Sequence, residues 1–223
     1  MLKNAMQEYY RERASEYDRF YEIPERQNDL LRLREWLVEH VRGRTVLEVA
    51  AGTGYWTEVA ASAAEAITAT DIHPELLALA GKRSLGRNVR LMPADAYALP
   101  AFVERFDAGM ALLWWSHVEK QRRQEFLSHF SARLQPGALL LMIDQVYVEG
   151  LSSPPQRQDE WGNQYTIRTV NSGAIYEIIK NYPSARDLTR SLENVCQDIE
   201  IVNLRHFWAV AARIRPAATH RSN

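Results

Sequence analysis

Short strand-like runs alternate with helix-like runs through the middle of the chain. Buried strands are indicated at 45–49, 66–71, 88–95, 106–115 and 138–144, and helices at 55–64, 74–83 and 119–134. Strands that alternate with helices favour right-handed crossovers and a parallel sheet with helices on both faces. This pattern constrains the chain more than any other feature and predicts an α/β fold.

The segments before and after this core differ from it in composition. Residues 6–20 are polar with aromatic side chains at helical spacing, and a second helix is expected from Pro24 to Gly43. Residues 1–43 are therefore predicted to form a helical cover, and residues 44–214 to form the main domain. Residues 145–175 are polar, contain Pro and Gly, and are too long for a plain connection, which predicts an insertion on the substrate side.

The C-terminal part of the sequence predicts several elements and leaves one segment undecided. Residues 174–182 fit a strand or a helix equally well. A helix over 184–192 is indicated by Ser184 as N-cap with Asp187 in the capping-box position. Residues 199–205 and 207–214 favour a closing pair of strands, and residues 215–223 are predicted to be a disordered tail.

Charge and composition exclude several classes of protein. The 223 residues carry 27 basic and 28 acidic side chains without a basic block, so no nucleic-acid partner is expected. The apolar runs are too short to span a membrane, and the N-terminus lacks the apolar core of a signal peptide. The single Cys196 excludes an internal disulfide. We expect a cytoplasmic protein with no membrane partner, and its oligomeric state stays open.

Acidic residues and a glycine-rich loop stand where the predicted strands end. Ligands of open parallel sheets bind beyond these carboxyl ends. The loop has Gly52 and Gly54 but Thr57 where the dinucleotide motif needs a third glycine. Glu48 just before the loop is a poor neighbour for a pyrophosphate and a good one for a cationic ligand. An NAD-dependent oxidoreductase is therefore the less favoured interpretation.

The ordered set of motifs resembles the class I S-adenosylmethionine-dependent methyltransferases that act on small molecules. Glu48–Gly54 is similar to the family's E/D-x-G-x-G-x-G motif, with Ala50 in place of the first glycine, and 133–144 is similar to its segment through the fifth strand. The resemblance covers about 46–143. It implies a Rossmann-like, seven-stranded, mostly parallel sheet with helices on both faces. It also implies S-adenosylmethionine as cofactor and in-line methyl transfer to a small-molecule acceptor.

The resemblance also implies the cofactor contacts. Asp71 would accept the ribose hydroxyls, Asp95 would read the adenine edge, and Glu48 would support the ammonium end. The alternative for Asp71 is a helix cap or turn residue, and the alternative for Asp95 is turn formation. Glu48 could instead support the residues that contact the ligand without touching the ligand itself. The full set of expected contacts is Tyr17, Glu48, Ala50, Gly52, Gly54, Asp71, Ile72, Asp95, Ala96 and Leu112.

Two residues are candidates for a general base, His117 after the fourth strand and Asp144 at the end of the fifth. The alternative for His117 is a bracing role beside the next helix. Arg168 is a candidate for holding an anionic acceptor, and a solvated loop charge is its alternative. The expected acceptor contacts are Tyr9, Tyr10, Trp115, Trp161, Tyr165 and Arg168, with 180–183 also facing the substrate.

Two motifs of related methyltransferases are missing. The carboxylates that precede this histidine in metal-binding relatives are absent, so no metal is expected. The N/D-P-P-Y run of enzymes that methylate nucleic-acid bases or glutamine is also absent. A non-catalytic S-adenosylmethionine-binding regulator or partner subunit stays possible on sequence alone. A protein-directed methyltransferase is disfavoured by the long insertion.

Overall fold

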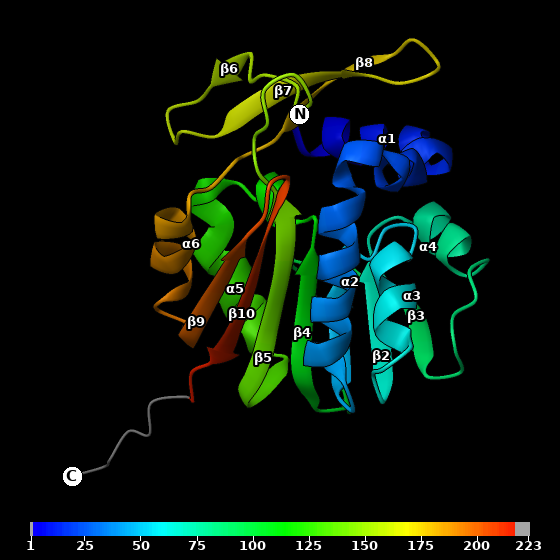
Figure 1. The fold of residues 1–223 in the computed structure, drawn as a ribbon, viewed down its shortest axis with the longest axis vertical. Helices are drawn as coiled ribbons and strands as arrows, with labels where there is room; N and C mark the ends of the chain where they lie inside the picture. Colours follow the sequence, from blue (N-terminus) through cyan, green and yellow to red (C-terminus); the bar gives the residue numbers. More distant parts are fainter. Residues whose placement is uncertain (1, 217–223) are drawn as a thin grey trace.

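The computed structural model describes residues 2–216, and a seven-stranded sheet forms its centre (Figure 1). The strand order is β3-β2-β1-β4-β5-β10-β9, and β10 runs antiparallel to both of its neighbours while the remaining pairs are parallel. The predicted α/β, mostly parallel architecture and the closing strand pair are confirmed. The strands are β1 Thr45–Val49, β2 Ala66–Asp71, β3 Val89–Pro93, β4 Phe106–Leu112, β5 Leu134–Gln145, β9 Cys196–Asn203 and β10 Phe207–Ile214.

Helices cover both faces of this sheet. On one face, α2 (Gln27–Val41) and α3 (Tyr55–Ala61) pack against apolar residues such as Val46 of β1. On the other face, α5 (Arg123–Ser131) and α6 (Ala185–Leu192) pack against Leu47 and its neighbours. Adjacent residues of a strand point to opposite faces, so each buried strand contributes to two cores. Helix α4 (Pro74–Ala80) lies beside β2 and β3.

The N-terminal cover begins as an α-helix and continues as a tighter helix. Helix α1 (Leu2–Arg13) is followed by the 3₁₀-helix η1 (Ala14–Glu22), where the sequence predicted one helix over 6–20. A 3₁₀-helix aligns residues three apart. Tyr17 and Phe20 are so spaced, and both pack against the core formed with α2 and α3. A short 3₁₀ turn, η2 (Pro24–Arg26), then leads into α2.

Residues 157–179, which begin inside the predicted insertion and extend beyond it, form a small antiparallel sheet of their own. Its strands are β6 (Arg157–Gln158), β7 (Gln164–Thr169) and β8 (Ile175–Ile179). In the undecided segment 174–182, residues 175–179 are thus a strand, because they pair with β7. Figure 1 shows this sheet and α1 together above one end of the main sheet. Glu12 of α1 joins them by accepting from Ser172 Oγ at 2.9 Å and Tyr176 Oη at 2.7 Å.

Two further elements complete the chain. The capping box that the sequence predicted at the start of α6 is present between Ser184 and Asp187. Between β4 and α5 lie the 3₁₀ turns η3 (Trp115–His117) and η4 (Lys120–Arg122). Within residues 2–216, no helix combines the length and apolarity that crossing a membrane requires. Residues 217–223 of the expected tail lie outside the described part.

Candidate active site

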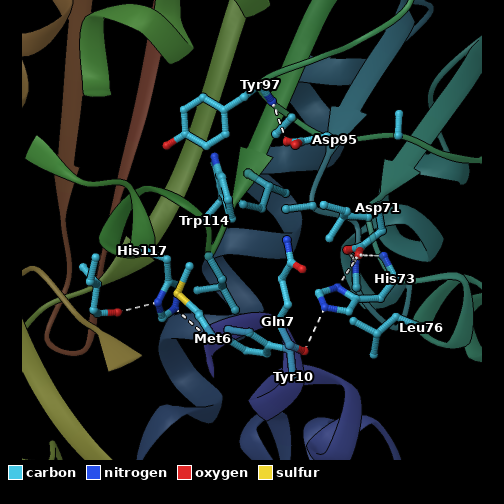
Figure 2. A pocket seen from close by; sticks show the side chains of 18 of the residues that line it. Met6, Gln7, Tyr10, Asp71, His73, Leu76, Asp95, Tyr97, Trp114 and His117 are labelled. Atoms are coloured by element: carbon cyan, nitrogen blue, oxygen red, sulfur yellow. Dashed lines mark hydrogen bonds and ion pairs between the residues drawn. The ribbon is translucent and has the colours of Figure 1, made fainter. Parts of the chain in front are cut away.

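A cavity of about 150 Å³ lies between the carboxyl ends of the central strands and α1 (Figure 2). The loop after β1, the end of β2, the segment after β3 and the end of β4 all contribute to its lining. Every cofactor contact expected from the sequence lines this cavity except Glu48 and Gly54. The lining includes Tyr17, Ala50, Gly52, Asp71, Ile72, Asp95, Ala96 and Leu112.

The two glycines of the first loop have different roles. Both have a left-handed backbone, with φ of +57° at Gly52 and +77° at Gly54. A Cβ on Gly52 would meet no atom within 4 Å, so its backbone faces open space in the cavity. A Cβ on Gly54 would lie 2.8 Å from the Cβ of Ala80 in α4. Gly54 therefore allows helix α4 to approach the loop.

Ala50 stands where the family motif has its first glycine, and its φ is +52°. Residues with a Cβ pay a steric penalty in this region. Leu113, after β4, also has a positive φ of 56° and lines the cavity. Backbone strain of this kind often gathers at functional sites.

Glu48 lies beneath the loop and does not line the cavity. Its Oε2 accepts a hydrogen bond of 2.7 Å from Thr57 Oγ1, at the start of α3. Burial raises the pKa of the Glu48 carboxyl to about 7, although the Thr57 hydrogen bond opposes this shift. Thr57, at the position of the missing third glycine, thus binds the acidic residue of the motif.

Asp71 at the end of β2 joins two loops of the site. Its Oδ2 accepts from the backbone N–H of Gly52 at 2.8 Å, and its Oδ1 accepts from the backbone N–H of His73 at 2.8 Å. The His73 ring lies 3.1 Å from the same Oδ1. A carboxylate has about four acceptor positions, so Oδ2 keeps capacity for a ligand.

His73 connects Asp71 to the helical cover. Its Nδ1 faces the Asp71 carboxylate, and its Nε2 lies 2.9 Å from the carbonyl oxygen of Gln7 in α1 (Figure 2). Both partners only accept hydrogen bonds, so both ring nitrogens carry a proton and the ring is charged. Burial lowers the pKa of His73, but Asp71 and the Gln7 carbonyl raise it above its ordinary value.

A second cavity of about 390 Å³ lies next to the first, between α1, η1 and the small sheet. The two cavities share the side chains of Tyr10, Tyr17, Leu113 and His117, which form a wall between them. Of the acceptor contacts expected from the sequence, Tyr9, Tyr10 and Arg168 line the second cavity, and so do Lys180 and Tyr182 of the 180–183 segment.

His117 forms part of the shared wall and is held from both sides. Its Nδ1 lies 2.7 Å from the carbonyl oxygen of Ile179, and its Nε2 lies 2.7 Å from Tyr10 Oη. A carbonyl only accepts, so Nδ1 carries the proton and Nε2 accepts from the Tyr10 hydroxyl. Burial lowers the pKa of His117 to about 3, and the charge of Lys180 adds to this. The ring is therefore neutral.

Asp144, the other candidate base, is fully buried and lines neither cavity. Its Oδ1 lies 3.2 Å from Lys180 Nζ, and its Oδ2 accepts from the backbone N–H of Ser116 at 2.8 Å. Burial raises the pKa of Asp144, but the charge of Lys180 and the hydrogen bond from the backbone N–H of Ser116 lower it below its ordinary value. Asp144 is thus an ionised anchor for Ser116 of η3 and for Lys180, just after β8.

Three expected acceptor contacts lie away from both cavities. Trp115 is buried in the core beside Phe126. Trp161 is 58% exposed in the turn before β7. The Tyr165 hydroxyl donates to Asp159 Oδ2 at 2.9 Å. Within residues 2–216, no group of three or more His, Cys, Asp or Glu side chains is arranged to hold a metal ion.

Other lining residues were not identified from the sequence. The first cavity also includes Met6, Gln7, His73, Tyr97 and Arg122, and the second includes Arg13 and Arg26. Tyr9, Arg13 and Tyr17 follow one another at four-residue spacing, which is a usable sequence signal. Arg26 and His73 had no such signal, because only the folding of distant segments brings them to the cavities.

Comparison with known proteins agrees with this geometry. Residues 46–137 match the family described as a methyltransferase domain. The comparison with curated proteins gave no match.

Solved structures extend the similarity to nearly the whole chain. A DhpI–SAH complex and a DhpI–SAM–HEP complex each have 28% sequence identity and a TM-score of 0.77, over 96% of this chain and 98% of that chain. SAM-bound CalS10, an amino pentose methyltransferase from Micromonospora echinaspora, has 16% identity and a TM-score of 0.58, over 82% of this chain and 90% of that chain. The likeness to CalS10 shows the fold alone.

Proposed function

We propose that this chain, a class I S-adenosylmethionine-dependent methyltransferase by its domain and its fold, transfers the methyl group to a small-molecule acceptor. The observation that carries the proposal is the pair of adjoining cavities under α1 and the small sheet. The second cavity, at about 390 Å³, has the size of a small-ligand site. A cover of this kind suits a small acceptor better than a folded protein.

The first cavity fits the cofactor by its chemistry. Gly52 lets a ligand approach the backbone, and Asp71 would accept hydrogen bonds from the ribose hydroxyls. Ile72 is 40% exposed within the lining and would pack against the adenine. The indole N–H of Trp114 is buried in this lining without a partner in the described chain, and a ligand acceptor would satisfy it. When bound, S-adenosylmethionine supplies an electrophilic methyl group on a positively charged sulfur.

The shared wall sets the conditions for in-line transfer. Tyr10 and Tyr17 border both cavities, and burial raises both phenol pKa values, so both rings stay protonated. Because the His117 ring is neutral, it adds no positive charge to the wall. An imidazolium at this position would repel the cationic methyl donor. With a pKa of about 3, His117 is a weak base, and we assign it the positioning of the Tyr10 hydroxyl.

Cofactor binding is tested by calorimetric titration with S-adenosylhomocysteine. Asp71→Asn should weaken binding by about 1–3 kcal/mol, because a charged acceptor is lost. Glu35→Gln, an exposed change on α2, is the control and should leave binding unchanged. Unchanged affinity in a folded Asp71→Asn protein would contradict the assignment.

The acceptor class is tested with methyl-labelled S-adenosylmethionine. The protein is incubated separately with the small-molecule fraction and the protein fraction of a cell extract. We expect label to accumulate in the small-molecule fraction, and Asp71→Asn to reduce it. Label in the protein fraction alone would overturn the proposed acceptor class.

A further inference from the structure

The charged side chains that line the second cavity are all basic. Its lining contains Arg13, Arg19, Arg26, Arg168 and Lys180, and no Asp or Glu among the described residues. The chain as a whole carries 27 basic and 28 acidic residues, so this local excess does not follow from composition.

None of the four arginines has a carboxylate partner within residues 2–216, and three of them donate instead to neutral groups. Arg13 donates to Tyr9 Oη at 2.6 Å, Arg26 donates to the carbonyl oxygen of Phe20 at 3.3 Å, and Arg168 donates to the hydroxyl of Ser153. All three guanidinium groups are thus held by neutral groups.

The positive charges are also partly withdrawn from water. Arg26 is 9% exposed, and the Nε of Arg168 is buried without a hydrogen-bond partner in the described chain. Burial lowers the pKa of Arg26, and the charges of Arg168 and Arg13 lower it further. Buried charges without a counter-charge are costly. Lys180 differs, because Asp144 neutralises it at 3.2 Å.

We propose that Arg13, Arg26 and Arg168 bind a multiply charged oxyacid group of the acceptor. The planar guanidinium fork matches the oxygen atoms of carboxylates and phosphates. Three guanidinium groups carry three positive charges, and a single carboxylate neutralises only one of them. This excess of positive charge favours a dianion of the phosphate type. This inference rests on the proposed function, since it names the chemical class of the acceptor in the second cavity.

The position of the cluster places the anion near the transfer site. The same cavity is bounded by Tyr10 and His117, and the charge of Arg168 contributes to the lowered pKa of His117. An acceptor held by its anionic group would thus present its adjoining atoms to the wall shared with the cofactor cavity. The arginines would also attract an anionic acceptor over long distances.

The experiment titrates the protein, saturated with S-adenosylhomocysteine, with inorganic phosphate and with acetate at fixed ionic strength. We expect phosphate to bind saturably and acetate to bind more weakly. Arg168→Gln and Arg13→Gln should each weaken phosphate binding by about tenfold or more. Arg157→Gln is the matched control, because Arg157 lies on the small sheet, pairs with Glu177 and lines neither cavity.

Each result decides one question. Absence of phosphate binding, or equal binding in the Arg168 and Arg157 variants, would overturn the inference. Equal affinity for acetate and phosphate would overturn the preference for a dianion. Titration with S-adenosylhomocysteine alone separates the two proposals: its failure contradicts the proposed function, whereas its success without phosphate binding contradicts only the inference. Arg13 and Arg168 lie on different elements, so a folding defect in one variant leaves the other as a test.

Discussion

The two glycines of the first loop offer a sharp test, because the structure assigns one to the ligand and the other to packing. The changes are Gly52→Ala and Gly54→Ala, which add the same methyl group two residues apart. Both residues have a positive φ, so both variants bear a strain of about 1–2 kcal/mol, offset by about 0.4–1 kcal/mol of unfolded-chain entropy. This common part leaves Gly52→Ala destabilised by about 0–1.6 kcal/mol.

Gly54→Ala has an additional cost. Its new Cβ would lie 2.8 Å from Ala80 Cβ and 3.2 Å from Ala80 Cα. The second atom belongs to the backbone of α4, so a side-chain rotation cannot relieve the contact. Overpacking of this kind costs about 1–3 kcal/mol. The expected total for Gly54→Ala is about 1–4.6 kcal/mol.

Two assays separate these effects. Urea unfolding should show the larger loss of stability in Gly54→Ala, while titration with S-adenosylhomocysteine should show the larger loss of affinity in Gly52→Ala. The new methyl group of Gly52→Ala enters open space in the cavity lining. Equal losses of stability, or unchanged ligand affinity in Gly52→Ala, would refute the reasoning.

Three further predictions concern protonation. Burial raises the pKa of Glu48 from 4.5 to about 7, so the unfolding free energy of the wild type should fall as pH rises through this window, by roughly 3 kcal/mol. The unfolding free energy of Glu48→Gln should not fall in this way. Parallel curves of unfolding free energy against pH for the wild type and the variant would contradict the prediction. The charged His73 ring faces Asp71 and Glu75 and forms a hydrogen bond with the Gln7 carbonyl of α1. These contacts raise the pKa of His73 above its ordinary value of 6.5. The packing of α1 over the first cavity should therefore weaken as pH rises above 6.5. Hydrogen exchange in α1, corrected for intrinsic rates, should show this weakening in the wild type and not in His73→Gln. Because the pKa of His117 is about 3, the rate of methyl transfer between pH 6 and 9 should show no change caused by titration of this histidine. A loss of rate near pH 6.5 in the wild type that disappears in His117→Gln would show instead that His117 acts as the general base.

Much of the fold was predictable because its signals are local. The strand runs around Leu112 and Leu140 are continuous and apolar, as buried parallel strands require, and the capping box at Ser184 lies within four residues. The segment 174–182 had no such signal. Its strand conformation depends on pairing with β7, which is a tertiary contact.

The candidate site was predictable only in part, for the same reason. Asp71 and Asp95 follow strands, and the geometry of a parallel sheet brings strand ends together. The motif could not separate the role of Gly52 from that of Gly54, because the difference depends on Ala80, 26 residues beyond Gly54.

The sequence by itself determined the layered α/β architecture and the edge of the sheet where a ligand would bind, since periodicity and strand ends are properties of neighbouring residues. The tertiary structure decided which charges meet there. It placed Arg13 and Arg26 from the N-terminal cover beside Arg168 from the insertion, and it buried His117 against Tyr10. These contacts join segments more than 100 residues apart in the chain. Their electrostatic effect depends on burial, and burial exists only once the chain is folded.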